Sequence, residues 1–210
     1  MSDINIVQIG ANVGKSQTDA SWILVEKFGW TGLFVEPIPK SFDKLKDYYT
    51  NFDKNHLFEN CAIIGDKHKT KVTINYSEKE KLSVMASVGN ASGRPENNLS
   101  LLVPAMTLES LLEKHNMLNK EFELLQMDVE GLESSIVNNT DFNKVIPKRI
   151  RLETIHNRNN SSMLEFLKSF GYKVVDDFYW EIYSDHLTHN YAELKWNVEH
   201  KCFNTLLERS

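Results

Sequence analysis

Short apolar segments alternate with longer segments of helical periodicity along most of this chain, and that alternation leaves few folds open. Residues 4–9 are rich in Ile and Val, and a helix is expected from about residue 13 to residue 28, where Trp22, Val25 and Phe28 recur at helical spacing. The same succession returns at residues 32–36 and 39–49, and at residues 122–127 and 132–138. The sequence therefore predicts an α/β fold, a parallel sheet with helices on both faces.

Shorter signals complete the expected order of elements. Strands are predicted at residues 57–64, 71–76, 149–153 and 172–176, and helices at residues 108–115 and 163–170. Residues 180–183 follow the preceding strand closely enough to pair with it antiparallel. The predicted sheet is mostly parallel, with an antiparallel edge.

The 210 residues are enough for one domain with a sizeable core, so a single domain is expected over residues 1–210. Residues 77–104 carry little periodicity and several Gly, Ser and Asn residues, which is typical of a lid or a substrate-binding insertion. Residues 185–210 are expected to form a tail.

Composition narrows the choice of partners and location. The net charge of −5 argues against a nucleic-acid partner, because such binding depends on neutralising phosphates. No apolar run reaches the ~20 residues that cross a bilayer, so no membrane partner is expected. The first residues lack the basic and then apolar pattern of a signal peptide, which predicts a cytoplasmic location. Two cysteines, without a Cys-x-x-Cys pair, argue against a disulfide framework and against structural zinc.

In sheets of this kind ligands bind beyond the carboxyl ends of the strands. The first strand ends in a G-x-x-x-G turn made of Gly10, Ala11, Asn12, Val13 and Gly14. A ligand can approach Gly10 closely because glycine has no Cβ, and the N-terminus of the next helix attracts carboxylate or phosphate. Alternatively, the turn binds no ligand and serves only to pack the following helix against the strand. Asn12 replaces the second glycine of the G-x-G-x-x-G motif, which argues against a dinucleotide.

Three further strand ends carry acids. Glu36, before Pro37, stands where a carboxylate can accept both hydroxyls of an adenosine ribose. Asp128 and Glu130 are spaced i, i+2, so one can orient a cofactor or substrate while the other caps the next helix. Glu153 ends another strand and His156 follows it; imidazole is suited to general-base work near neutral pH, although a loop histidine without function is the commoner case.

Five blocks of the sequence, in this order, resemble the FkbM family of S-adenosylmethionine-dependent methyltransferases. They are Val-Gln-Ile-Gly-Ala-Asn-Val-Gly at residues 7–14, Phe-Val-Glu-Pro at 34–37, Asn-Cys-Ala-Ile at 60–63, Thr-Leu-Glu-Ser-Leu at 107–111 and Gln-Met-Asp-Val-Glu-Gly at 126–131. The resemblance runs from about residue 4 to residue 175 and therefore covers most of the chain.

The resemblance implies a Rossmann-like class I methyltransferase fold, with a seven-stranded, mostly parallel sheet whose last strand is antiparallel. It also implies S-adenosylmethionine as the cofactor and O-methylation of a hydroxyl on a small molecule or glycan acceptor. The Gly10–Gly14 turn would hold the methionine half of the cofactor and Glu36 its ribose. Asp128 and Glu130 would face the junction of cofactor and acceptor.

The complete set of cofactor-binding residues expected on these grounds is Gln8, Gly10, Ala11, Asn12, Val13, Gly14, Glu36, Pro37, Cys61, Ala62, Ile63, Asp128 and Glu130. Within it, the resemblance implies that Cys61, Ala62 and Ile63 line the adenine at the end of the third strand. Gln8 stands where such motifs often have aspartate, which puts any ionic role of this position in doubt, although a neutral amide can still hydrogen-bond near the cofactor.

Methyl transfer to an alcohol also needs a base, and Asp128, Glu153 and His156 are the catalytic candidates, in no fixed order. The same three residues with Glu130 could instead hold a divalent metal, but no spacing demands one and none is expected.

Two other functions stay open. One is a nicotinamide-dependent oxidoreductase, disfavoured by the missing glycine and the lack of room for a catalytic domain. The other is a non-catalytic module that keeps the cofactor as a scaffold. The short segment before the first strand implies an open site or one completed by another subunit, which leaves a homo-oligomer open.

Overall fold

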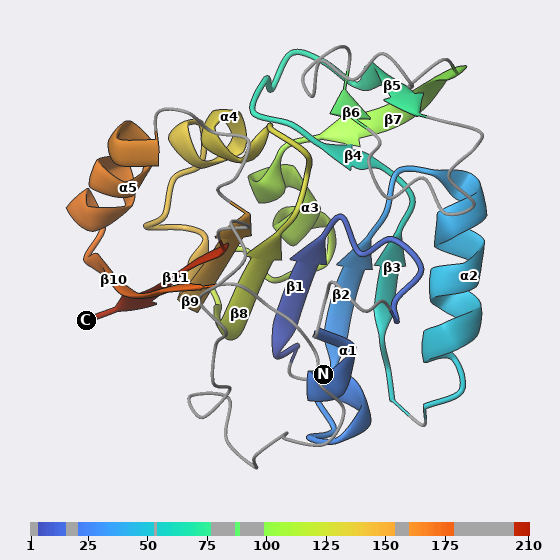
Figure 1. Cartoon of the computed structure of the whole chain (residues 1–210), viewed down its shortest axis with the longest axis horizontal. Helices are drawn as coiled ribbons and strands as arrows, with labels where there is room; N and C mark the ends of the chain where they lie inside the picture. Colours follow the sequence, from blue (N-terminus) through green and yellow to red (C-terminus); the bar gives the residue numbers. More distant parts are fainter. Residues whose placement is uncertain are drawn as a thin grey trace.

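The computed structural model describes residues 4–15, 21–52, 54–76, 87–88, 99–153, 160–178 and 204–210 (Figure 1). The main sheet has seven strands, which are β1 (Ile6–Ile9), β2 (Gly32–Val35), β3 (Leu57–Glu59), β8 (Glu121–Met127), β9 (Ile146–Glu153), β10 (Tyr172–Phe178) and β11 (Asn204–Arg209). They are ordered β10-β11-β9-β8-β1-β2-β3. Neighbouring strands from β9 to β3 are parallel, and β11 is antiparallel to both β9 and β10. This confirms the predicted seven-stranded, mostly parallel sheet with an antiparallel last strand.

The place of β11 differs from the sequence prediction. The partner of β10 is β11, not residues 180–183, which lie outside the described residues. Residues 204–209 were assigned to a tail, but they form a strand inside the sheet, where Leu206 and Leu207 are buried. Only two apolar residues stand between polar ones in this segment, so it carries too weak a hydrophobic pattern to be recognised as a strand.

A second sheet, which the sequence analysis did not predict, contains β4 (Ala62–Ile63), β5 (Lys71–Tyr76), β6 (Ser87–Val88) and β7 (Leu99–Met106) in the order β4-β7-β5-β6. Strands β4 and β7 are parallel, whereas β5 is antiparallel to both β7 and β6. In Figure 1 this small sheet lies above the carboxyl ends of β1 and β2. It is therefore on the side of the main sheet where ligands of α/β proteins bind.

In two segments around the small sheet the secondary structure differs from the predicted one. The single strand expected at residues 57–64 is broken, because the Asn60 side chain donates to the Glu36 carbonyl at 2.7 Å and the chain then crosses to β4. Residues 99–104, expected in a lid, belong to β7, where Val103 is buried and Leu102 faces outward. The strand was not predicted from sequence because it contains Pro104, and proline has no backbone N–H group to donate to a strand ladder. Residues 77–86 and 89–98 of the expected lid lie outside the described residues.

Helices cover both faces of the main sheet, as predicted. The helices are α1 (Ser21–Glu26), α2 (Pro39–Tyr49), α3 (Leu108–Lys114), α4 (Glu133–Asn138) and α5 (Asn160–Ser169). On β1, Ile6 packs with α1 and α2, whereas Val7 packs with α3, α4 and α5, because successive strand residues face opposite ways. The helix expected from residue 13 does not begin there, since residues 12–14 form a turn and bend.

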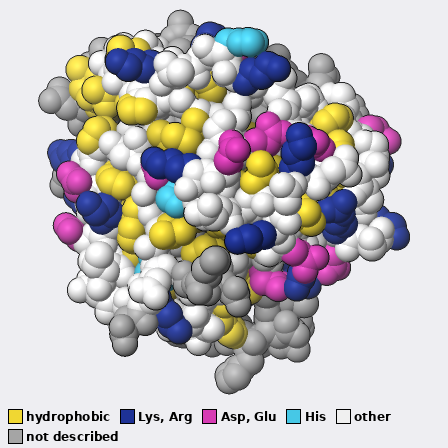
Figure 2. Space-filling view, turned by 180° about the vertical axis from the view of Figure 1, so that it is seen from behind, with side chains coloured by type: hydrophobic (Ala, Val, Ile, Leu, Met, Phe, Trp, Pro, Cys, Tyr) yellow, Lys and Arg dark blue, Asp and Glu magenta, His cyan; other side chains and the backbone are white. Residues whose placement is uncertain are grey.

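The surface of the described residues gives two further observations. No helix among them is long and apolar enough to span a membrane. On the face in Figure 2, Lys and Arg side chains alternate with Asp and Glu side chains and with hydrophobic ones.

Candidate active site

The Gly10–Gly14 turn leaves β1 at the carboxyl edge of the main sheet and is fixed by its own amides. The amides of Gly10 and Ala11 donate to the Val35 carbonyl at 3.0 and 2.9 Å. Gly10 has a φ of +80°, and a Cβ on it would lie 1.9 Å from the Asp128 carbonyl oxygen. Only glycine fits here, and the close approach packs the turn against the end of β8.

Asn12 lies within this turn in a left-handed conformation, with a φ of +48°. Its amide donates to Oε2 of Glu36 at 2.9 Å. Its side-chain Oδ1 is buried and has no hydrogen-bond partner in the described part of the chain. Because a buried carbonyl oxygen is costly to leave unpaired, this atom suits a donor on a bound ligand, such as an ammonium group.

Glu36 follows β2 and turns inward, with only 6% of its surface exposed. Its Oε2 accepts from the Asn12 amide and its Oε1 accepts from the Ile38 amide, each at 2.9 Å. Burial raises the pKa of Glu36 to about 7; the two amide bonds oppose the rise, and the charge of Asp128 adds to it. Each carboxylate oxygen keeps a further acceptor position, so the side chain can still bind ribose hydroxyls.

Asp128 and Glu130 follow the end of β8, beside the glycine turn. The Asp128 amide donates to the Ile9 carbonyl at 3.0 Å, which continues the ladder between β1 and β8 by one residue. Glu130 and Gly131 then have φ values of +54° and +104°, so two successive residues with positive φ turn the chain toward α4. This bend is strained for a residue with a Cβ such as Glu130.

Glu133, the first residue of α4, stabilises this bend through hydrogen bonds to its backbone. It is completely buried, and its Oε1 accepts from the Val129 amide at 2.9 Å while its Oε2 accepts from the Gly131 amide at 3.1 Å. One carboxylate therefore pairs with the amides on both sides of Glu130.

The structure brings together three of the predicted acids: Asp128, Glu130 and Glu153, here called the acidic trio. Met127 lies opposite Leu152 in the ladder between β8 and β9, so the next residues, Asp128 and Glu153, lie at adjacent strand ends. One carboxylate oxygen from each member of the trio lies within 4.8 Å of the others. The trio lies next to the Gly10 turn, because Asp128 contacts that turn directly.

Burial raises the pKa of Glu153 to about 10, and the charges of Asp128, Glu130 and Glu133 and a hydrogen bond with Asp128 add to the rise. Glu153 is consequently protonated at neutral pH. Two carboxyl groups can share a hydrogen bond only if one of them carries a proton, so Glu153 and Asp128 hold one proton between them. Such a pair can take up a proton from a nearby hydroxyl group.

The trio also has the chemistry of a cation site, since carboxylate oxygens are the ligands that Mg²⁺ and Ca²⁺ prefer. Its negative charge equally suits the positively charged sulfonium and ammonium groups of S-adenosylmethionine. Together with the unpaired Oδ1 of Asn12 and the inward-facing Glu36, the residues present fit this cofactor.

The remaining predicted site residues have positions that give less direct support for a role in cofactor binding. Cys61, Ala62 and Ile63 are buried at the crossing into β4 rather than at the end of the third strand, and burial raises the pKa of Cys61 to about 12. Gln8 is buried on the face covered by α1 and α2. The role of these residues toward the cofactor stays a prediction, as does that of His156, which lies outside the described residues.

Two residues that sequence reasoning did not assign to the site support it. Asn60 holds the Glu36 carbonyl, and Glu133 holds the bend at Glu130. Both are polar residues close in sequence to an acidic strand end, but this proximity alone assigns no role to either of them.

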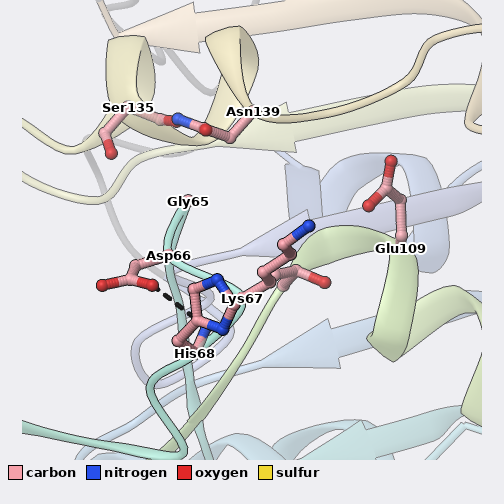
Figure 3. Close-up of a pocket in the computed structure, with 8 residues that line it drawn as sticks. Gly65, Asp66, Lys67, His68, Glu109, Ser135 and Asn139 are labelled. Atoms are coloured by element: carbon pink, nitrogen blue, oxygen red, sulfur yellow. Dashed lines mark hydrogen bonds between the residues drawn. The ribbon is translucent and has the colours of Figure 1, made fainter.

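A pocket of about 450 Å³ lies near the same side of the molecule and is lined by Gly65, Asp66, Lys67, His68, Thr107, Glu109, Ser135 and Asn139. Figure 3 shows Ser135 on α4 and Asn139 directly after it opposite the loop that follows β4, with Glu109 on α3 to one side. Its walls are held by local bonds: the Asn139 side chain donates to the Ser135 carbonyl at 2.8 Å, and Glu109 accepts from the Asp141 amide at 2.8 Å. Every lining side chain is polar, so the pocket suits a ligand rich in hydroxyl groups.

Comparison with known protein families gives a match over residues 8–174, to the model described as the methyltransferase FkbM domain. This range contains the glycine turn, Glu36 and the whole acidic trio. A search of curated proteins finds no match.

Comparison with solved structures finds two methyltransferases among the similar chains. One is a TehB-like SAM-dependent methyltransferase from Corynebacterium glutamicum ATCC 13032 Kitasato, with 11% identity, a TM-score of 0.44, and coverage of 100% of this chain and 82% of that chain. The other is a precorrin-6y C5,15-methyltransferase from Geobacter metallireducens GS-15, with 12% identity, a TM-score of 0.40, and coverage of 99% and 80%.

Proposed function

Because the chain belongs to the FkbM family of methyltransferases, which use S-adenosylmethionine, we propose that it methylates a hydroxyl oxygen on a small molecule or glycan. The observation that carries this proposal is the position of the Asp128 and Glu153 carboxyl groups, which lie within 4.8 Å of each other at adjacent strand ends beside the glycine turn. An alcohol must lose its proton as the new C–O bond forms, and an acidic pair at this place can accept it.

In this proposal the strand ends have separate tasks. The cofactor supplies the methyl group as an electrophilic carbon on a sulfonium centre. Glu36 accepts the ribose hydroxyls, and the free Oδ1 of Asn12 accepts from the ammonium group of the methionine half. Holding donor and acceptor in line at contact distance can supply ~7–11 kcal/mol of the barrier reduction.

We assign the base to Asp128. At neutral pH Glu153 retains its proton because its pKa is about 10, so Glu153 cannot take up the proton of the acceptor. The hydrogen bond from Glu153 orients the Asp128 carboxylate. His156 remains an alternative base. If the trio binds a divalent metal, the ion would lower the pKa of the acceptor hydroxyl instead.

The polar pocket supports an acceptor with several hydroxyl groups. Lys67, Ser135 and Asn139 offer donors and acceptors around a space of about 450 Å³, a size that suits a small molecule or one or two sugar units. We propose that the part of the acceptor that is not methylated binds there.

Two measurements test the proposal. Calorimetric titration with S-adenosylhomocysteine should show binding, and its absence at millimolar ligand would remove the cofactor assignment. Methyl transfer from S-adenosylmethionine to a panel of sugars, polyols and phenols should then release S-adenosylhomocysteine with at least one hydroxyl acceptor. Transfer only to amines or thiols would contradict O-methylation.

Family membership argues against the alternative of a nicotinamide-dependent oxidoreductase. The second alternative, a non-catalytic module, predicts cofactor binding without turnover on any acceptor of the panel. A cytoplasmic location and a homo-oligomeric state stay predictions.

A further inference from the structure

Glu133 is a buried acid that has no role in the reaction as proposed above. It is 0% exposed, although a buried carboxylate is costly unless its charge is well paired. Two of its partners are backbone amides four and two residues earlier, those of Val129 and Gly131. These contacts lie directly on the segment that carries Asp128 and Glu130, two members of the acidic trio.

The segment needs such a contact because its backbone is strained. Glu130 has a φ of +54° between two residues whose amides are both bound by Glu133. A residue with a Cβ returns to negative φ unless the surroundings hold it. A change of φ at Glu130 would carry its carboxylate away from Asp128 and Glu153, with which it now lies within 4.8 Å.

We propose that Glu133 is a positioning residue, which fixes the bend at Glu130 and thereby holds Asp128 and Glu130 in the arrangement used for methyl transfer. In this assignment Glu133 acts mainly through the backbone of residues 129–131, and its charge in addition contributes to the raised pKa of Glu153. The inference rests on the proposed function for its catalytic consequence, whereas its structural part can be measured without turnover.

The test compares Glu133→Gln and Glu133→Ala with a matched control, Asp141→Asn. Glutamine retains the size of the side chain, but its amide nitrogen cannot accept from a backbone N–H group, so one of the two bonds is lost. Asp141 also accepts from an amide two residues away, that of Asn143 at 3.0 Å, but it lies after α4 and away from the acidic trio, and its own amide, which donates to Glu109, is retained when only its side chain is changed. The control removes a similar charge and bond without touching the trio.

Two readouts separate positioning from a purely structural role. In ¹H–¹⁵N spectra the amide protons of Val129 and Gly131 should shift upfield in Glu133→Gln, and their hydrogen exchange should accelerate at least about 10-fold in Glu133→Ala. In kinetics, kcat should fall roughly 10–100-fold in Glu133→Gln while KM for S-adenosylmethionine changes less than about 3-fold, because misplacement of reacting groups affects mainly the chemical step. Asp141→Asn should change neither readout.

Unchanged amide signals in both Glu133 variants would overturn the inference, and so would altered signals with an unchanged kcat. A fall in kcat that merely follows the unfolded fraction, measured by thermal denaturation, would also overturn it. If the wild-type protein methylates no acceptor, the proposed function fails by itself. The amide readout then still decides whether Glu133 fixes the bend.

Discussion

The two ends of strands β8 and β9 carry acidic side chains in opposite surroundings. Near the amino ends, Lys148 lies 2.6 Å from Glu123 and Arg149 lies 2.9 Å from Glu208, so acids alternate with bases. The hydrogen bond with Glu123 is the main reason why the pKa of Lys148 is raised. At the carboxyl ends, acids lie beside acids, and the pKa of Glu153 rises to about 10. Only the second arrangement changes which side chains are protonated at neutral pH.

This difference indicates where the protein places chemistry and where it places stability. Exposed ion pairs such as those at the amino ends contribute little each and need no special geometry. A cluster of like charges in a buried position destabilises the folded state, and such clusters are concentrated at functional sites. The comparison can be tested by changing matched acids at the two ends.

The largest expected effect is that of Asp128→Asn. Removal of the proposed base should lower kcat by about 10²–10⁴-fold, because asparagine cannot take up the proton of the acceptor. The rate of S-adenosylhomocysteine release at saturating substrates measures it. Glu123→Gln, in the same strand but at its paired end, should leave kcat unchanged. Equal losses in both variants would show that the two ends do not differ in function.

The next effect concerns the neighbouring strand end. Glu36→Ala should weaken binding of S-adenosylhomocysteine roughly 10–100-fold, because the ribose hydroxyls lose their acceptor and the Asn12 amide loses its partner. Isothermal titration calorimetry measures the change. Glu59→Gln is the control, since Glu59 ends β3 but pairs with Lys114 and His115 at 2.8 Å. Unchanged affinity in Glu36→Ala would remove the ribose assignment.

A third prediction concerns the dependence of stability on pH. A carboxyl group whose pKa is higher in the folded than in the unfolded state stabilises folding below the unfolded value and loses that contribution as pH rises. For Glu153 this window runs from about 4.5 to about 10, and for Glu36 from about 4.5 to about 7. The free energy of unfolding should therefore decrease with rising pH through both groups.

Glu153→Gln should flatten this decrease above pH 7, where Glu36 no longer contributes. The difference between wild type and variant should change by about 5 kcal/mol between pH 5 and pH 9, at about 1.4 kcal/mol per pH unit. Urea unfolding at pH 5, 7 and 9, without cofactor, measures it. Parallel curves for the two proteins would mean that Glu153 titrates normally.

A smaller effect is expected at the polar pocket. Lys67→Ala should raise KM for a hydroxyl acceptor about 3–10-fold, through loss of one hydrogen bond to the bound acceptor, and leave the affinity for S-adenosylhomocysteine unchanged. Steady-state kinetics with the best acceptor of the panel provide the measurement. Lys44→Ala, on α2 and away from the pocket, is the control. If KM is unchanged in Lys67→Ala, the acceptor lies elsewhere.

The main sheet was predictable because its signals are local. Local sequence patterns indicate the apolar strands β1, β2 and β8 and the glycine turn. The acids Glu36, Asp128 and Glu153 stand at strand ends. Their convergence follows from topology alone, since parallel strands bring their carboxyl ends to one edge.

The rest depended on contacts between distant residues. The break between β3 and β4 arises because Asn60 binds the carbonyl of Glu36, 24 residues away, and no local pattern encodes that bond. The position of β11 between β9 and β10 likewise depends on pairing with strands that precede it in the sequence, and no pattern within residues 204–209 indicates that pairing. Glu133 could not be assigned from sequence because its role depends on the left-handed backbone of Glu130, which only the structure reveals.

The smallest expected effect returns to the paired ends of β8 and β9. Lys148→Ala removes contacts with both Glu121, at 3.4 Å, and Glu123, at 2.6 Å, yet all three side chains are partly exposed to solvent. Solvent and salt screen such pairs, so Tm should fall by about 2 °C or less and kcat should not change. Differential scanning calorimetry at low and high salt measures the change, and added salt should reduce the small difference further. A large loss of Tm, or any loss of kcat, would mean that the amino ends also support the site, and the contrast between the two ends would then be wrong.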